Sequence, residues 1–526
     1  MKAISFKAMT TLLGVLVPLF SQAFSLLGPL EPWMTETNNY GRPGDIGGPM
    51  DITNGYRWNT PVITYSFDQS FLNYFGSNGV AAVNSAIKIL NDLPPASQIV
   101  LSNFPTDARG LNYTAQSLSL YDLKSTTLFL LLEQLGLTSP SRYCYTLDGW
   151  DPSLFVYGGG GFWVGVSGTN YQFNSNPQDP GGHVFDFIIH RNYDPETFTP
   201  SFSVNDVLLG ASVYSEMSAP NDYYPTEFNF TIPFPVDPFA TSYSAVADFV
   251  SAFTQGQGQF YTGLTKDDVG GLRYLLATNN YKVENLLPDV HGTGTNANDW
   301  VDGALRGGVD KITFVEAPMN SFLGTFFSPV TNRYTDTYRT NGMPKRQQLE
   351  RVTSRPDIVF TMEDEMTPAL SIMDRTGTTN WINNAALNGS PGGAGPGMVR
   401  PGIRIAFTKI SHAYWSQGAS DGPQSVTLGL APWSSYDGST NDPILYPINL
   451  PGIHQTEFQL RLRFGSKEQN FIWQPGGGSD AVFAMQVSTN LVDWTSAFAV
   501  PNDGSVCRYY VVDPASPNRF YRVIQQ

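Results

Sequence analysis

Three segments of the chain carry hydrophobic residues at helical spacing. Residues 80–90 are apolar at every third or fourth position, and the Asp-Leu-Pro-Pro stretch at 92–95 predicts the end of that helix. Residues 118–135 predict a second, strongly apolar helix that ends at Gly136. Residues 264–276 predict a third helix, which begins with the Thr-x-x-Asp spacing of a capping box.

Other segments have the patterns of β-strands. The stretches FQLRLRF (458–464) and AVFAMQVS (481–488) alternate between apolar and polar residues, as half-buried strands do. VITYSF (62–67) is a continuous run of strand-forming residues, and β-type runs also recur through residues 143–234. The sequence therefore predicts a multidomain protein, with an α+β N-terminal part followed by an all-β, sandwich-like C-terminal part.

Changes in composition predict where the chain divides. It has 526 residues, which is more than one hydrophobic core normally holds. The stretch GSPGGAGPGMVRPG (389–402) has the composition of a linker. We expect a signal peptide at residues 1–23, an extended arm at 24–57 and an α+β domain at 58–290. A mixed domain or extension at 291–402 should end in the linker, and a β-sandwich-like region should follow at 403–526.

The first residues have the features of a secretory signal. Lys2 and Lys7 precede a short apolar run, and Ser21 and Ala23 are small residues at the positions that a signal peptidase requires. This pattern predicts cleavage after Ala23 and a secreted, extracellular or cell-surface location. No later stretch approaches the roughly 20 apolar residues of a membrane helix, so no transmembrane segment is expected after cleavage.

Composition narrows the range of partners. The chain has a formal net charge of −15, which argues against nucleic acid, because binding to nucleic acid requires clustered Lys and Arg. The partner itself is not identified; a component of the cell envelope, an extracellular polysaccharide or a protein all fit. The sequence alone does not show whether its two cysteines, Cys144 and Cys507, form a disulfide.

The usual catalytic motifs are incomplete in this sequence. None of the five histidines has a second histidine four residues later, so there is no H-E-x-x-H motif. Ser420 lies in a G-x-S-x-G match, but Pro423 follows where a nucleophile elbow requires a helix. We therefore predict no catalytic, cofactor-binding or metal-binding residues and no cofactor, with calcium as the one ion still considered.

The calcium candidate is the loop DGSTND (437–442). Asp437, Ser439 and Asn441 stand at positions 1, 3 and 5 of an EF-hand loop. The pattern then fails, because Asp442 replaces the required glycine and Ile448 replaces the bidentate glutamate. An ordinary turn stabilised by Asp and Asn side chains fits the same residues.

The segment that ends at Gly136 resembles the zinc helix of metzincin metalloproteases, H-E-x-x-H-x-x-G-x-x-H. When the glycine is placed at Gly136, the three histidine positions fall on Phe129, Glu133 and Ser139, and the position of the catalytic glutamate falls on Leu130. The resemblance thus implies a metzincin-like scaffold that lacks the imidazole ligands and the general base.

Two neighbouring segments extend this resemblance. The strand and helix of residues 62–92 precede the zinc-like helix much as in matrixins, and LTKDDVGGLRYLL (264–276) looks like the closing helix of a matrixin. Together these parts cover discontinuous pieces of residues 58–278. An unrelated α+β domain fits as well, because helices that end at a glycine are common.

The C-terminus carries a second resemblance. VSTNLVDWTSAF (487–498) and the final RFYRV (519–523) are similar to a small β-sandwich module at the end of many secreted bacterial proteins. The whole chain resembles a family of uncharacterised exported bacterial proteins, and that family brings no known activity with it.

These features predict a secreted or cell-surface protein with a non-catalytic binding or structural role. One alternative is an extracellular hydrolase, acting on polysaccharide or peptide, whose carboxylates are dispersed along the sequence. Another is a subunit of an extracellular matrix or filament, which large exposed apolar patches or unpaired edge strands would indicate.

Overall fold

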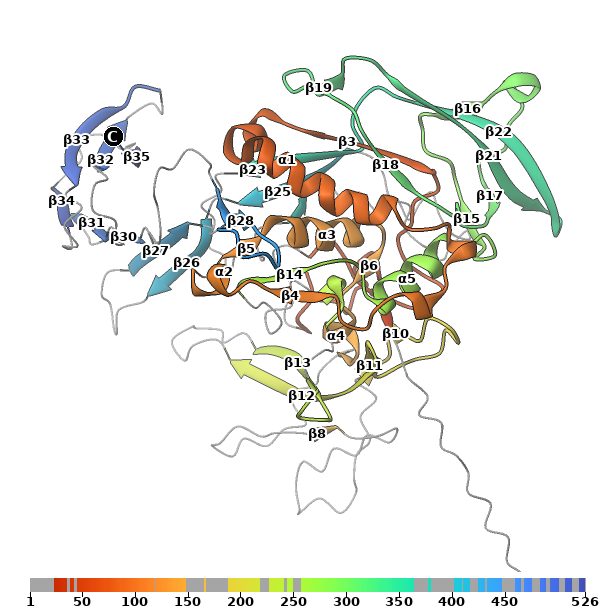
Figure 1. The fold of residues 1–526 in the computed structure, drawn as a ribbon, viewed down its shortest axis with the longest axis horizontal. Coiled ribbons are helices and arrows are strands. Elements are labelled where there is room, and N and C mark those ends of the chain that lie inside the picture. Colours follow the sequence, from red (N-terminus) through yellow and green to blue (C-terminus); the bar gives the residue numbers. More distant parts are fainter. Residues whose placement is uncertain are drawn as a thin grey trace, which may run out of the picture.

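The computed structural model combines α-helices with several β-sheets, and strands predominate (Figure 1). Among the residues that it describes, no helix is long and apolar enough to cross a membrane. The structure describes residues 23–525 except for 36–37, 42–44, 119, 148–164, 167–187, 218–226, 241–243, 249–256, 364–376, 380–401, 409, 417–423, 431–432, 447–458, 465–467, 475–482, 489–491, 501–506 and 513–519. Several expected features lie outside the described residues: the signal peptide before Ala23, nearly all of the Gly/Pro-rich linker, and Ser420.

A five-stranded sheet forms the centre of the molecule. Its strands, in spatial order, are β18 (Thr313–Glu316), β3 (Val62–Phe67), β23 (Ile358–Glu363), β25 (Ile403–Thr408) and β24 (Gly377–Thr379). The first four strands are parallel and β24 is antiparallel to β25. Ile63, Phe360 and Ile405 are fully buried, as parallel strands covered on both faces require.

This sheet crosses two of the expected domain boundaries. Strand β3 comes from the expected α+β domain, whereas β18 and β23 come from the segment expected to be separate. Strand β25 begins at Ile403, where the C-terminal region was expected to start, and pairs with β23 along its whole length. Short apolar strands give no sequence signal of their partners, so the sequence alone did not indicate that these three segments share a sheet.

Helix α1 (Gln69–Asn91) packs against the central sheet and against helix α3. It begins with Asp68, whose carboxylate accepts a hydrogen bond from the amide of Phe71 at 3.0 Å. The predicted apolar face is present: Val83, Ile87 and Leu90 are buried. The helix starts earlier than its apolar spacing indicated and changes direction at Gly76, whose φ of 59° interrupts the helical geometry.

Helix α3 (Leu123–Gln134) is shorter than the helix predicted over residues 118–135. Helix α2 (Tyr113–Ser117) and strand β5 (Tyr121–Asp122) occupy the preceding residues. Asp122 is the N-cap of α3, and its carboxylate accepts a hydrogen bond from the amide of Ser125 at 2.9 Å. Aspartate is one of the residues preferred at this position.

The end of α3 requires glycine. Gly136 has a φ of +100°, and a Cβ at this position would lie 2.1 Å from the carbonyl oxygen of Tyr56. The predicted glycine after the helix is therefore required for two reasons: the backbone has a positive φ, and there is no room for a Cβ atom.

The segment expected to be an extended arm contributes to the core. Strand β1 (Phe24–Gly28) pairs with β2 (Gly48–Met50), β10 (Asn192–Tyr193) and β6 (Leu137–Thr138). Phe24 and Leu26 are buried. Helix α5 (Lys266–Leu276) packs on β1 and has the predicted capping box between Thr265 and Asp268.

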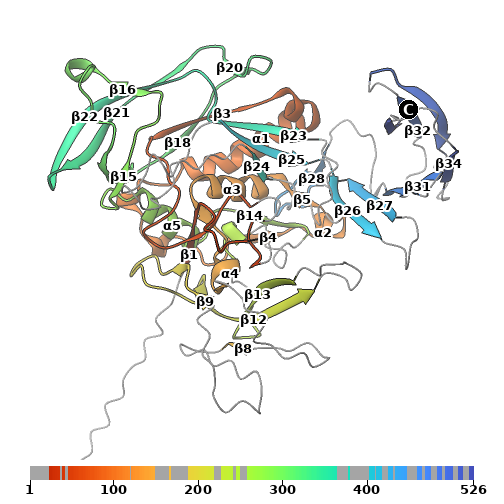
Figure 2. The same cartoon turned by 180° about the vertical axis from the view of Figure 1, so that it is seen from behind.

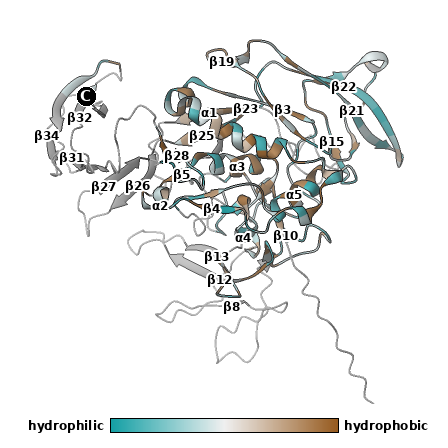
Figure 3. Cartoon of the chain, viewed as in Figure 1, coloured by the Kyte–Doolittle hydropathy of each residue, from teal (hydrophilic) through white to brown (hydrophobic). Residues whose placement is uncertain are grey.

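A second five-stranded sheet is entirely antiparallel. Its order is β15 (Lys282–Glu284), β17 (Ala304–Arg306), β21 (Val330–Thr340), β22 (Met343–Thr353) and β16 (Val290–Gly292). Strands β21 and β22 form a long hairpin at the periphery of the molecule in both views (Figures 1 and 2). We call this assembly the hairpin sheet. Figure 3 shows hydrophilic residues along β21 and β22, in contrast to the hydrophobic centre of the molecule.

The C-terminal strands form two further antiparallel sheets. One contains β26 (Ile410–Ser416), β27 (Gln424–Leu430), β30 (Gln459–Phe464), β31 (Glu468–Gln474) and β34 (Cys507–Val512). The other contains β33 (Thr495–Val500), β32 (Phe483–Ser488) and β35 (Phe520–Gln525). Both alternating stretches, 458–464 and 481–488, thus contain strands.

Candidate functional site

The residues at the zinc-ligand positions of the metzincin pattern serve other purposes here. Phe129 and Leu130 are buried in the main hydrophobic core. Leu128, Leu131, Leu132 and Leu135, the stripe at i, i+3, i+4 and i+7, are buried as well. Helix α3 is therefore enclosed by packing on most sides, so it functions in the fold as a central core helix.

Ser139 occupies the position of the third histidine and starts the short helix α4 (Pro140–Tyr143). Its hydroxyl donates a 2.6 Å hydrogen bond to Oδ1 of Asp248. The amide and hydroxyl of Ser141 donate to the same oxygen at 2.9 and 2.8 Å, and the amide of Ala245 donates to Oδ2. Burial raises the pKa of Asp248 to about 6, although these hydrogen bonds act in the opposite direction.

Glu133 occupies the position of the second histidine and is half-buried. Desolvation raises the pKa of its carboxyl group well above the usual value; Asp45 adds to this effect and Arg142 opposes it. Arg142 forms a bidentate ion pair with Asp45, at 2.7 and 2.9 Å, and lies over the ring of Tyr143 at 4.9 Å. A raised pKa favours the protonated form of a carboxyl group, and a protonated carboxyl group is the form that a general acid requires.

The structure places the calcium candidate in an exposed turn. Oδ1 of Asp437 accepts a hydrogen bond from the amide of Ser439 at 2.8 Å, which is the geometry of an Asx turn. Asn441 follows in the same turn and donates its amide to the hydroxyl of Ser439 at 3.3 Å. Within the described part of the chain, no group of three His, Cys, Asp or Glu residues is arranged to hold a metal ion.

Helix α5 adds two buried carboxylates: Asp268, which belongs to the predicted capping box, and Asp267, which no motif indicated. Asp268 accepts hydrogen bonds from the amides of Val246 and Ala247, both at 3.0 Å, and so ties α5 to the segment that contains Asp248. Asp267 accepts from the amide of Asn205 at 2.7 Å and from the amide of Ala23. Burial raises the pKa of both groups.

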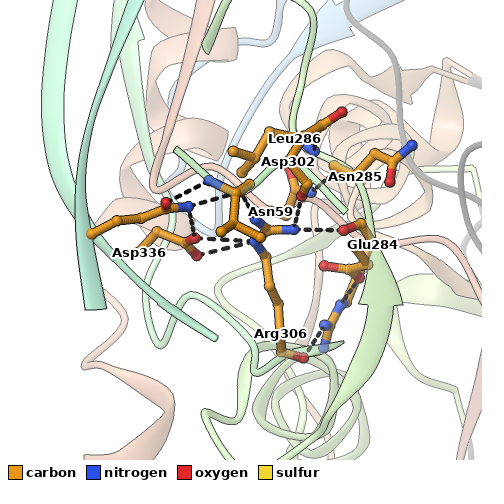
Figure 4. Close-up of polar contacts among 10 residues, drawn as sticks. Asn59, Glu284, Asn285, Leu286, Asp302, Arg306 and Asp336 are labelled. Carbon is orange, nitrogen blue, oxygen red and sulfur yellow. Dashed lines mark hydrogen bonds and ion pairs between the residues drawn. The ribbon is translucent and has the colours of Figure 1, made fainter. Parts of the chain in front are cut away.

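Buried arginines anchor the hairpin sheet, and Arg306 is the centre of one network (Figure 4). Its Nε lies 3.1 Å from Oδ2 of Asp336, and its terminal nitrogens donate to three backbone carbonyls, those of Glu284, Val301 and Asp302. Gln347 donates to the same Asp336 carboxylate at 2.7 Å. Arg306 thereby joins three strands of the sheet, since it lies on β17, Glu284 on β15 and Asp336 on β21.

Arg57 connects this network to the α/β core. Its Nε forms an ion pair with Glu284, and its terminal nitrogens donate to the carbonyls of Arg306 and Asn280 at 3.0 and 2.8 Å. Lys282 is buried close by, and its Nζ has no hydrogen-bond partner among the described residues. Burial and, to a smaller extent, Arg57 lower the pKa of Lys282 to about 7, while Glu284 opposes the change.

A third buried arginine, Arg351, links β22 to the central sheet. It pairs with Asp357 at 2.6 Å and with Asp289 at 2.9 Å. The carboxylate of Asp357 also accepts the amide and hydroxyl of Thr64 at 2.7 and 2.9 Å. One face of the hairpin sheet is thus fixed to the core by the fully buried Arg351–Asp357 ion pair, and the partly exposed Asp289 adds to it.

The opposite side of the hairpin sheet, which we call the outer face, is exposed. The side chains that alternate with the buried ones on β21 are Thr331, Arg333, Thr335, Thr337 and Arg339. The register places them opposite Val352, Glu350, Gln348, Arg346 and Pro344 of β22. His291 extends this face on one side beside Glu350, and Leu305 and Val283 extend it on the other beside Arg339.

Two further titratable side chains, those of Cys144 and His190, lie outside these networks. Cys144 is a buried free thiol whose Sγ is 3.9 Å from the carbonyl oxygen of Ser201, and burial raises its pKa. His190 is half-buried, and burial lowers its pKa.

No family model, no curated protein and no solved structure matches this chain.

Proposed function

We propose that this protein is an exported, non-catalytic binding protein and that the outer face of the hairpin sheet is its ligand-binding surface. The observation that carries the proposal is the contrast between the two sides of one sheet. Arg57 and Arg351 fix one side to the core, while the other side exposes polar residues along two strands of 11 residues each.

Such a surface suits binding because its shape is set before a ligand arrives. Association is weakened when side chains or loops have to be ordered, so a pre-formed surface retains more of its interaction energy. On the outer face, Gln348 and Thr335 already form a cross-strand hydrogen bond at 2.9 Å. Hydroxyl, amide and guanidinium groups on a regular sheet offer donors at repeated intervals.

The rest of the chain has a supporting place in this proposal. An α+β N-terminal part carries the hairpin sheet, and an all-β, sandwich-like C-terminal part follows it as a further module. The signal-like residues before Phe24 supply the route out of the cell. Extracellular polysaccharide or a component of the cell envelope would then be the available ligand.

A hydrolase is the second candidate, and Glu133 is the observation that favours it. A half-buried carboxyl group with a raised pKa, next to the Asp45 carboxylate, resembles the acid half of an acid–base pair. This candidate requires that a substrate reach Glu133.

Affinity electrophoresis of the purified full chain in gels that contain neutral or acidic polysaccharides tests the proposal. We expect at least one polysaccharide to retard the protein, and we expect Thr337→Trp, which blocks the outer face, to abolish the retardation. Thr340→Trp, on the other face of the same hairpin, is the matched control. Retardation that survives Thr337→Trp would contradict the proposed surface. Release of reducing ends or of peptide that is lost in Glu133→Gln would favour the hydrolase.

A further inference from the structure

The hairpin of β21 and β22 has a charge opposite to that of the protein. The whole chain has 30 Lys and Arg residues against 45 acidic residues. Between Thr337 and Gln348, at the end of the hairpin, there are three cations, Arg339, Lys345 and Arg346, and no acid. All three are exposed.

These cations are available to a ligand to different degrees. Lys345 and Arg346 form no ion pair with any described residue. Arg339 lies over the ring of Tyr281, with its guanidinium carbon 4.0 Å from the ring centre. This contact orients the guanidinium group, and the Arg339 side chain stays exposed to solvent. Arg333, farther along the outer face, pairs with Glu350.

The register spaces the arginines along one line. Arg346 is opposite Thr337, so it is a diagonal neighbour of Arg339 at about 7–8 Å. Arg333 lies four residues from Thr337 on the same strand, which is about 13 Å. A ligand that contacts all three must therefore be extended and must carry negative groups at intervals.

The acidity of the whole protein does not cancel this local charge. The screening length is about 8 Å at physiological ionic strength, so acids elsewhere on the surface have little influence at the end of the hairpin. Among the described residues of the outer face, only Glu350 carries a negative charge, and Arg333 pairs with it.

The neutral residues of the outer face indicate which class of polyanion, nucleic acid or acidic polysaccharide, suits this surface better. Nucleic acids bound as single strands use aromatic side chains for base stacking. The described outer-face residues of β21 and β22 include none; they are threonine, glutamine, valine and proline besides the charged residues. The ring of Tyr281, beside this face, is covered by the guanidinium group of Arg339. Hydroxyl and amide groups instead match the hydroxyl and carboxylate groups of sugars.

We propose that the outer face binds an extended acidic polysaccharide, with Arg339 and Arg346 as the main contacts to its carboxylate or sulfate groups and Arg333 as a weaker one. This inference rests on the proposed function, because it names the ligand class of the same surface. Guanidinium groups suit this role because they bind carboxylate and sulfate through two parallel hydrogen bonds.

The test compares dextran with dextran sulfate, which share a backbone and differ in charge. With the full chain in affinity electrophoresis, we expect dextran sulfate but not dextran to retard migration, and we expect retardation to fall steeply with added salt. Arg339→Gln combined with Arg346→Gln should weaken binding by at least about tenfold, in line with about 1.4 kcal/mol or more for two lost charged contacts. Lys88→Gln combined with Arg355→Gln removes the same charge from other exposed sites and should leave binding nearly unchanged.

Several results would overturn the inference. Equal weakening in the control variant would mean that only total charge matters. Tighter binding to single-stranded DNA or to phosphatidylserine vesicles than to dextran sulfate would assign the cations to another class of partner. The Arg339/Arg346 variant could also form oligomers in size-exclusion chromatography and still bind dextran sulfate. That result would mean that the cations prevent edge-to-edge pairing of strands between molecules and do not bind the ligand. Binding to neutral dextran that Thr337→Trp abolishes would refute the acidic ligand and leave the proposed surface intact, whereas no binding to any polysaccharide would refute both.

Discussion

The end of helix α3 and the hairpin sheet both concentrate polar and charged side chains, but they direct them differently. Around α3, the carboxyl groups of Asp248 and Asp268 point inward and are occupied by backbone amides and hydroxyls of the same chain. On the hairpin sheet, Arg306 and Arg351 point inward and the outer arginines point to solvent.

The difference separates residues that hold the fold from residues that are free to bind. A buried polar group has to find partners within the protein, and each partner it finds is no longer available to a ligand. Substitutions around α3 should therefore change stability. Substitutions on the outer face should change binding and leave stability nearly constant.

The largest expected effect is at the inner side of the hairpin sheet. Arg351→Met should destabilise the protein by about 3–5 kcal/mol, because it leaves the fully buried Asp357 without its cation. Chemical denaturation at pH 7 measures this. Arg333→Gln is the control on the same hairpin: its ion pair with Glu350 is exposed, so the change should stay below about 1 kcal/mol. Similar losses for the two variants would erase the distinction between the two sides of the sheet.

The next effect concerns the packing of α3. Leu132→Ala should lower the free energy of unfolding by about 2–5 kcal/mol, since Leu132 is fully buried in the main core. Leu72→Ala on α1 is the matched control, because Leu72 is substantially exposed, and it should cost less than about 1 kcal/mol. A loss below about 1 kcal/mol for Leu132→Ala would mean that α3 is not the central core helix described above.

The smallest effect is a dependence on pH at the end of α3. The pKa of Asp248 is raised to about 6, so its folded state binds a proton more tightly than its unfolded state. Its contribution to stability is therefore largest below about pH 4 and is lost as the pH rises through about 6. Lowering the pH from 7 to 5 should stabilise the protein by about 1 kcal/mol through this group.

Asp248→Asn should flatten that part of the profile without removing the contributions of Asp267 and Asp268, which have the same sign. Denaturation midpoints at pH 5, 6 and 7 for both proteins provide the measurement. An unchanged slope in the variant would assign the pH dependence to other carboxyl groups.

Local features of the fold were predictable from the sequence. The apolar face of α1, the glycine after α3 and the capping box of α5 each depend on residues within a few positions of one another. The start of α3 was predicted too early because apolar spacing alone did not account for Asp122 as an N-terminal cap.

Long-range features could not be predicted in this way. Nothing in residues 62–67 specifies pairing with residues 313–316 and 358–360. The same limit applies to the hairpin sheet: a charge count along residues 337–348 shows the cations, but only the register with β22 and the burial of alternate residues show which of them share a face. The ion pair of Arg57 with Glu284 spans 227 positions of sequence, so no local pattern reveals it.

The topology of the central sheet also has a consequence for how the chain is made. Strand β3 leaves the ribosome early, yet β18 and β23, its neighbours on either side, follow more than 200 residues later, and β25 is later still. Contacts of such high sequence separation form slowly, and an unpaired apolar strand is prone to aggregate in the meantime. A nascent chain shorter than about 408 residues cannot complete the sheet, so VITYSF lacks its partner strands until most of the chain has been synthesised.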